Sequence, residues 1–359
     1  MMRFSHSDEC LALIESAARF VNDHYSSSES GNEPDATFNA ARWREFAEFG
    51  WLAIIVDEQA GGLSGGPAML SALAQAMGPG TIPEPLLSQC ALGGYMLNAL
   101  GNATKRQNLD AWLSGDAIVG FAHFEARNDR RTTPSALSTT VSGSGGEHRL
   151  NGAKTTVLDG GAGDVYLVTA ATSDGSAVLV LVDKDRPGLE ATVHPLFDGR
   201  QVSELSFTEV TLEATDIITL DGGRDAIIDE ALLLHDFVLA AESLGIARSL
   251  VDITHDYLLT REQFGTTLAD FQALQHRLVD MQLSIVRFDS LLVLARLKIE
   301  ELGLIGATRF IRAVAEGIAN LGRNIGREAV QLHGGIGMTD ELVVGRYLKR
   351  LTANELLVR

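Results

Sequence analysis

Apolar and polar residues alternate at helical spacing through the first part of the chain. Apolar positions recur every three or four residues between residues 7 and 25, which predicts an amphipathic helix. The same spacing predicts further helices at residues 38–50, 66–78, 86–101 and 104–114. Turn-forming residues separate some of them, as at the glycine-rich end of the segment GWLAIIVDEQAGGLSGGP. We therefore expect residues 1–115 to form an N-terminal helical domain.

The pattern changes to short β-rich runs near residue 116. Examples are AIVGFAHF, DVYLVTAAT, SAVLVLVD and LSFTEVTL, and turns with Gly, Asp, Asn and Pro separate the runs. Strands at short, regular intervals are typical of an antiparallel β-domain. We expect this domain, resembling a β-barrel, to span residues 116–222.

Long helical patterns return after the β-domain, at residues 226–260, 268–300, 306–333 and 341–351. They predict a C-terminal four-helix bundle at residues 223–359. Helices, then strands, then helices make an α+β chain rather than the alternating order of a Rossmann fold. No G-x-G-x-x-G sequence follows a predicted strand, so any dinucleotide would be bound by a different structural motif.

Charge and composition exclude several classes of function. The net charge is -18 and the pI about 4.9, which argues against nucleic acid and anionic membrane surfaces as partners. The two cysteines, Cys10 and Cys90, lie far apart and indicate neither a disulfide framework nor a metal site. Acidic residues interrupt the N-terminal segment, and no apolar run is long enough to span a bilayer. We therefore expect a cytoplasmic protein without a metal.

Three segments together resemble the acyl-CoA dehydrogenase family. They are FAEFGWLAIIVDEQAGGLSGGP at residues 46–67, TREQFGTTLADFQALQHRLVDM at 260–281 and AVQLHGGIGMTDELVVGRYLKRL at 329–351. The similarity covers nearly the whole chain, and the second and third segments combine unusual residues at fixed spacing. Within the family, the chain resembles the small auxiliary subunits of heteromeric α2β2 enzymes that act on pimeloyl-CoA or steroid side-chain CoA thioesters.

The resemblance implies a set of FAD-binding residues. An arginine fork suits a pyrophosphate, an aromatic ring offers a flat face, and a glycine turn lets a ligand approach the backbone. In the family, the arginine, the aromatic residue and the glycine turn contact the ADP half of the FAD of a neighbouring subunit, and the glutamine that Gln272 resembles lies near the isoalloxazine or ribityl side. Singly, each has an ordinary interpretation as a surface arginine or a helix C-cap. The residues in question are Arg261, Phe264, Gln272, Gln331, Gly334 and Gly335.

The flavin-facing half of the β-domain departs from the family pattern. The family segment TEPGAGSD is matched by HFEARNDRRT, which keeps Glu125 but has three arginines in place of small residues. The segment LNGAKTTVLDGG keeps an NG-x-K turn that includes Lys154. Thr156 and Leu158 stand where an aromatic and a hydroxyl residue are expected, so an aromatic platform has been lost.

The catalytic base also departs from the family. Dehydrogenation of a thioester between Cα and Cβ needs a carboxylate to remove the α-proton. The two family positions for this glutamate correspond to Val358 and His235. Asp236 and Glu242 are nearby substitutes and Glu355 is a poorer one, although such carboxylates more often form ion pairs or pack helices.

These observations lead to one hypothesis and three alternatives. The chain is expected to be an auxiliary subunit that completes the FAD site of a homologous catalytic subunit. The alternatives are a self-sufficient homotetramer with Asp236 or Glu242 as base, a non-catalytic acyl-CoA-binding scaffold, and a flavin-dependent oxidase or monooxygenase. By resemblance, an electron-transferring flavoprotein would be the electron acceptor. The sequence does not identify the acyl group.

Overall fold

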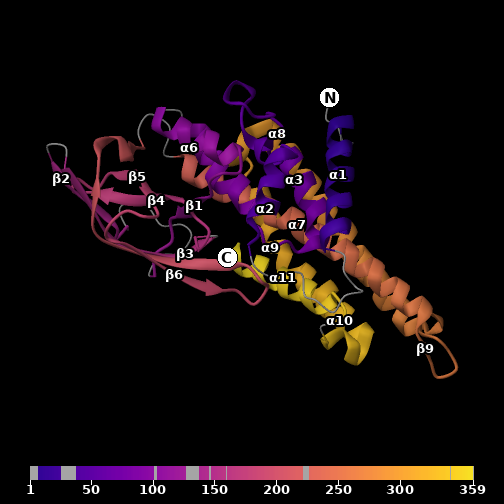
Figure 1. Ribbon diagram of the computed structural model, residues 1–359. Coiled ribbons are helices and arrows are strands. Elements are labelled where there is room, and N and C mark those ends of the chain that lie inside the picture. Colours follow the sequence, from indigo (N-terminus) through magenta and orange to yellow (C-terminus); the bar gives the residue numbers. More distant parts are fainter. Residues whose placement is uncertain are drawn as a thin grey trace. The chain divides into compact units, whose positions relative to one another are not determined.

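The computed structural model describes residues 7–25, 38–100, 103–126, 137–144, 147–158, 160–220, 226–339 and 341–358 (Figure 1). The chain divides into two compact units. The first contains residues 1–36, 66–82 and 233–359, and the second contains residues 37–65 and 83–232. The expected order of helices, strands and helices is confirmed. The domain boundaries predicted from the sequence at residues 115/116 and 222/223 remain predictions.

Helices make up nearly all of the first unit. Its elements are α1 (Asp8–Tyr25), α3 (Gly66–Met77), most of α7 (Ala226–Thr260), α8 (Gln272–Gly306), α9 (Thr308–Leu321), α10 (Arg327–His333) and α11 (Val344–Leu357), with a hairpin of β9 (Glu262–Gln263) and β10 (Thr266–Thr267). In Figure 1 this hairpin lies at the outer end of the α7–α8 pair. The prediction of long C-terminal helices is confirmed.

Apolar spacing and small residues explain the packing within the first unit. In α9, Ile311, Val314 and Ile318 recur at helical spacing and are all buried. Glycine permits a close approach of α3 to α7, because a Cβ at Gly245 would lie 2.1 Å from the carbonyl oxygen of Gln75. The helix predicted at 306–333 is present, but it contains a π-helical segment at Gly322–Gly326 between α9 and α10.

The second unit combines short helices with an eight-stranded sheet. Its helices are α2 (Ala40–Glu48), α4 (Leu86–Ser88), α5 (Tyr95–Leu100) and α6 (Ala103–Leu113). Its strands are β1 (Val119–Ala122), β2 (Thr140–Ser144), β3 (Glu147–Leu158), β4 (Val165–Thr172), β5 (Ala177–Asp183), β6 (Leu189–Pro195), β7 (Gln201–Leu212) and β8 (Ile217–Thr219). The strand order is β6-β7-β3-β2-β4-β5-β8, and β1 also pairs with β4.

The sheet is mixed rather than wholly antiparallel. Five of its pairings are antiparallel, whereas β1 and β2 both run parallel to β4. Alternate side chains on β7, including Leu205, Phe207 and Leu212, enter an apolar core that also takes side chains from β3, β4 and β5. This core supports the strands that carry the β-domain residues singled out in the sequence.

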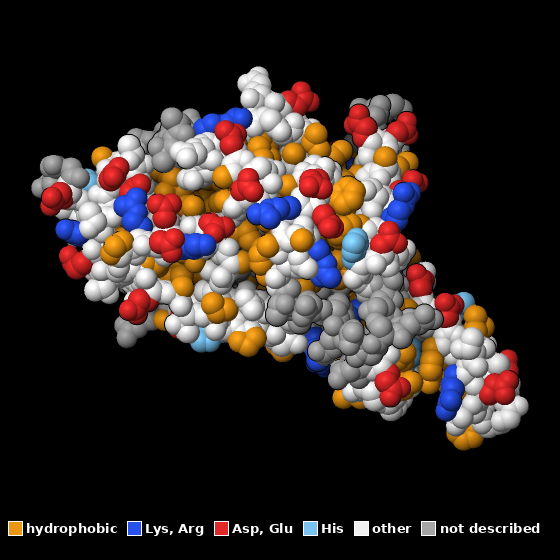
Figure 2. All heavy atoms as spheres, in the orientation of Figure 1, with side chains coloured by type: hydrophobic (Ala, Val, Ile, Leu, Met, Phe, Trp, Pro, Cys, Tyr) orange, Lys and Arg blue, Asp and Glu red, His pale blue; other side chains and the backbone are white. Residues whose placement is uncertain are grey.

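The surface agrees with the acidic composition. Figure 2 shows acidic and basic side chains interspersed over the face that it draws, and the described residues there form no continuous basic area. None of the helices within the described ranges is long and apolar enough to serve as a membrane span.

Candidate cofactor-binding site

A tight hairpin follows the end of α7. The Arg261 N–H donates to the carbonyl of Tyr257 (2.9 Å), and the Leu268 N–H donates back to the carbonyl of Arg261 (2.8 Å). Between them, β9 and β10 pair antiparallel. Phe264 and Gly265 form the two-residue connection, with φ angles of 60° and 86°. Positive φ at both positions is what a type I′ hairpin turn requires.

Phe264 is the most unusual residue of this hairpin. Its side chain is 91% exposed although it is a large apolar group. Its φ of 60° lies in the left-handed region that residues other than glycine rarely occupy. The ring makes an edge-to-face contact with Phe271, at 6.1 Å between ring centroids. A strained, exposed aromatic residue is a reasonable candidate for contact with a ligand.

The other predicted residues of this segment are also accessible. Arg261 and Gln272 are both exposed, and Gln272 is the first residue of α8. A Cβ added at Gly265 would meet no atom within 4 Å. The structure therefore places Arg261, Phe264 and Gln272 on one exposed connection between α7 and α8.

The second predicted segment is a glycine turn at the end of α10. Gly334 has a φ of 64°, and its N–H donates to the carbonyl of Gln331, which closes the helix. This N–H is therefore used to end the helix and is not an open donor for a ligand. A Cβ at Gly334 or Gly335 would meet nothing within 4 Å, and Gln331 is exposed. The turn is therefore open to close approach by another molecule.

Two residues that sequence reasoning missed connect these segments. The rings of Tyr257 and His333 stack with centroids 4.4 Å apart. The Tyr257 hydroxyl donates to the His333 carbonyl (3.3 Å). Burial lowers the pKa of His333 and outweighs the effect of its hydrogen bond to Ala329. Their positions in the sequence could have identified them, because Tyr257 lies one helical turn before Arg261 and His333 lies directly before Gly334.

Glu125 and Lys154, from two separate segments, form one buried cluster in the β-domain. The Lys154 ammonium lies 2.7 Å from the Glu125 carboxylate and also donates to Thr169. Glu125 accepts hydrogen bonds from Ser138 and Thr139, on the other side of residues 127–136. Those residues, which include the three arginines, lie outside the described part of the chain.

The ion pair controls the charge of both partners. Burial raises the pKa of Glu125, but the hydrogen bonds from Lys154 and Ser138 outweigh it and lower the pKa to about 2. Burial also lowers the pKa of Lys154 to about 8, against the attraction of Glu125. Both side chains are engaged with each other rather than exposed to a ligand.

The NG-x-K sequence lies inside strand β3, not in a turn as expected. Gly152, with a φ of 140°, allows the chain to pass Thr139 closely while the strand continues. The pairing register between β3 and β7 shifts between Lys154 and Val157, which marks a β-bulge. Thr156 lies on this bulge, is exposed, and has a positive φ of 53°. Leu158, in contrast, is buried.

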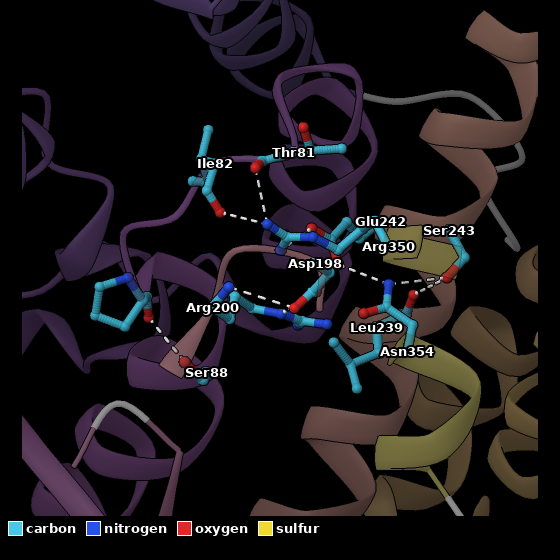
Figure 3. A network of polar contacts seen from close by, with 11 residues as sticks. Thr81, Ile82, Ser88, Asp198, Arg200, Leu239, Glu242, Ser243, Arg350 and Asn354 are labelled. Carbon is cyan, nitrogen blue, oxygen red and sulfur yellow. Dashed lines mark hydrogen bonds and ion pairs between the residues drawn. The ribbon is translucent and has the colours of Figure 1, made fainter. Parts of the chain in front are cut away.

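Glu242 lies in a buried polar network of α7 and α11 (Figure 3). One of its carboxylate oxygens is 3.2 Å from Arg350, and the other accepts a hydrogen bond from Asn354 (2.8 Å). Arg350 also donates to the carbonyls of Thr81 and Ile82. The side chains of Glu242 and Arg350 are 2% and 3% exposed. Both oxygens of Glu242 are therefore engaged within the protein.

The other candidate carboxylates differ in their exposure. Asp236 is half-buried on α7, next to the buried His235. Glu355 is half-buried on α11, and Val358 follows the last residue of that helix. Of the two carboxylates proposed as substitutes for the base, Asp236 is the more accessible. The described residues contain no group of three or more metal-ligating side chains.

Comparison with known proteins identifies the family. The model of the acyl-CoA dehydrogenase N-terminal domain matches residues 7–116, and that of the C-terminal domain matches residues 222–357. A curated relative, L-prolyl-[peptidyl-carrier protein] dehydrogenase from Serratia sp. (strain ATCC 39006), is 24% identical over 97% of this chain and 92% of its own length.

Solved structures show the same fold. The ChsE4–ChsE5 complex from Mycobacterium tuberculosis matches with a TM-score of 0.85 and 23% identity, covering 99% of this chain and 95% of the other. A variant of the Tcur3481–Tcur3483 steroid ACAD matches with a TM-score of 0.82 and 26% identity, covering 98% and 92%. The chain belongs to the acyl-CoA dehydrogenase family, whose members are flavoprotein oxidoreductases that act on CH–CH bonds and typically use FAD.

Proposed function

We propose that this chain is the auxiliary subunit of a heteromeric acyl-CoA dehydrogenase. In this proposal it completes the FAD site of a homologous catalytic subunit, which binds the acyl-CoA thioester and supplies the base. The residues of this chain bind and orient the nucleotide end of the cofactor. Bound FAD supplies the two-electron acceptor for α,β-dehydrogenation, and an electron-transferring flavoprotein would take the electrons onward.

The exposed and strained Phe264 is the observation that carries this proposal. A residue in the left-handed region costs on the order of 1–3 kcal/mol and persists where the surroundings or a function require it. The ring is 91% exposed, so no burial within this chain offsets the strain. Contact with a flat group of a neighbouring subunit's cofactor would account for both features.

The accessible groups of the hairpin and of the glycine turn suit a nucleotide diphosphate. Arg261 offers a planar guanidinium that can bind phosphate oxygens in a bidentate manner. The open faces of Gly334 and Gly335 allow a ligand to approach the backbone without meeting a side chain. Gln272 and Gln331 are exposed amides that can donate or accept hydrogen bonds.

The β-domain supports an auxiliary role. Thr156 occupies an exposed, strained bulge position and has no aromatic ring to place against a flavin. Glu125 and Lys154 neutralise each other in the core. The part of this chain that would hold its own flavin ring therefore lacks the family's aromatic platform.

The environment of the candidate base Glu242 also supports an auxiliary role. A base must meet the α-proton, but both oxygens of Glu242 already accept hydrogen bonds inside a buried network. Of the two solved structures named above, one is a complex of ChsE4 with ChsE5, and the other is named for two proteins, Tcur3481 and Tcur3483. Division of labour between two homologous chains accounts for these features together.

Co-expression with a homologous catalytic subunit tests the proposal. We expect Arg261→Gln and Phe264→Ala to lower the FAD content and activity of the complex strongly. Arg312→Gln and Phe197→Ala are matched controls, because both side chains are exposed and lie outside the two segments. Equal FAD content in all four variants would contradict the proposal, and a complex that never contains flavin would favour the scaffold alternative.

A homotetramer with its own base remains the second candidate, and its best residue is Asp236. This carboxylate is half-buried, whereas Glu242 is enclosed by Arg350 and Asn354. The candidate predicts that the chain alone is yellow and active, and that Asp236→Asn abolishes turnover while FAD stays bound.

A further inference from the structure

One aromatic pair connects the two segments that carry the proposed cofactor residues. Tyr257 stacks on His333 with ring centroids 4.4 Å apart and an angle of 29° between the planes. The same tyrosine accepts the Arg261 N–H at its carbonyl (2.9 Å) and donates its hydroxyl to the His333 carbonyl (3.3 Å). Tyr257 is thus bonded to the base of the hairpin and to the last residue before the glycine turn.

His333 is held rigidly on its other side. Its side chain is 3% exposed, and Nδ1 lies 2.8 Å from the carbonyl oxygen of Ala329 in the preceding turn of α10. A carbonyl can only accept, so Nδ1 carries the proton in this contact. The ring is therefore fixed between a backbone carbonyl and the face of Tyr257.

The geometry of the peptide bond extends this constraint to Gly334. The carbonyl that Tyr257 binds belongs to the peptide unit that joins His333 to Gly334, and a peptide unit is planar. Fixing its carbonyl therefore fixes the direction in which the glycine turn leaves the helix. A second tie joins the start of α8 to α10, where Arg277 and Glu328 form an ion pair at 2.6 Å.

We infer that Tyr257 and His333 are positioning residues that hold the Arg261 hairpin and the Gly334–Gly335 turn together as one preformed cradle for a nucleotide diphosphate. This inference rests on the proposed function. A ligand that binds a preformed site does not lose affinity to the ordering of two separate loops. In this inference the pair acts through Arg261 and the turn rather than by binding the cofactor itself.

The test measures the FAD dissociation constant of the assembled flavoprotein after reconstitution of the apo complex. Tyr257→Phe keeps the ring and removes the hydroxyl, and we expect about fivefold weaker FAD binding. Tyr257→Leu also removes the stack, and we expect a loss on the order of thirtyfold. His333→Phe should retain more affinity than His333→Ala, because only the first preserves a stacked ring.

Tyr347→Phe is the matched control. It removes a buried tyrosine hydroxyl that donates to the carbonyl of Pro79 (2.7 Å) in the same unit, outside the hairpin and the turn. It should lower the melting temperature as much as Tyr257→Phe but change FAD affinity less than twofold. The positioning role would be refuted if both variants lost FAD affinity equally, in proportion to their loss of stability.

Arg261→Gln separates this inference from the proposed function. If Arg261→Gln weakens FAD binding while Tyr257→Phe does not, the proposed function stands and the coupling is refuted. If neither variant changes FAD binding, the proposed function itself fails.

Discussion

Removal of the charge on Glu242 distinguishes a structural carboxylate from a catalytic one. In the Glu242→Gln variant, Arg350 keeps its buried positive charge but loses the opposite charge 3.2 Å away. The new amide also has one acceptor oxygen where the carboxylate had two, so either Arg350 or Asn354 faces an N–H group instead. Both defects lie where the side chains are 2–3% exposed.

The expected cost is large. Breaking a buried ion pair by removing one partner costs about 3–5 kcal/mol, because the remaining charge stays buried and has lost an adjacent opposite charge. The unfolding entropy of globular proteins, scaled to 359 residues, is roughly 0.75 kcal/mol/K. The melting temperature should therefore fall by about 5 °C. Glu300→Gln is the control, since the Glu300 side chain is 47% exposed to water and its pair with Arg296, four residues earlier on the same helix, is worth less than about 1 kcal/mol.

Thermal unfolding and turnover are measured on the same preparations of the assembled enzyme. We expect Glu242→Gln to lose stability and to keep turnover with acyl-CoA thioesters at temperatures where it remains folded. Addition of Arg350→Met should cost less than the sum of the two single changes, because both changes remove the same Glu242–Arg350 interaction. An unchanged melting temperature together with abolished turnover would refute this reasoning and identify Glu242 as the base.

Two further predictions concern the acid range and the hairpin. The pKa of Glu125 is lowered to about 2 in the folded protein, below its ordinary 4.5, so its contribution to stability is complete above about pH 4.5 and is lost as the pH falls toward 2. The free energy of unfolding, measured with denaturant at pH 7, 5 and 3, should therefore be lower for Glu125→Gln than for the wild type by about 3 kcal/mol at pH 7. This difference should shrink at pH 3, and a difference that does not change with pH would contradict the prediction. Phe264→Asn should relieve about 1 kcal/mol of backbone strain and raise the melting temperature slightly while it weakens FAD binding, and a variant that is both less stable and fully FAD-loaded would contradict the strain argument.

Local periodicity was sufficient to predict most of the helices and strands. The buried face of α9, with Ile311, Val314 and Ile318, repeats at a spacing that any helical arrangement requires. The π-helical segment at Gln89–Gly94 lies inside the helix predicted at residues 86–101, and the helical spacing of that stretch did not indicate it. A Cβ at Gly94 would lie 2.3 Å from the Trp112 ring.

The site residues were predicted where a motif is local and missed where a contact is long-range. Phe264 belongs to a short motif, so the resemblance to the family singled it out, although its exposure and strain did not follow from that motif. The Tyr257–His333 contact joins residues 76 positions apart, and the Glu242–Arg350 pair joins residues 108 apart. Pairing at such separations is set by tertiary packing, which no local pattern encodes.

The FAD content of the purified chain, alone and with a homologous catalytic subunit, is the most direct test of the auxiliary role. The account predicts that the chain alone retains no stoichiometric flavin. It predicts that the complex contains one FAD for each catalytic subunit, and that Arg261→Gln in this chain lowers this ratio. Stoichiometric FAD and full dehydrogenase activity in the chain by itself would contradict the account.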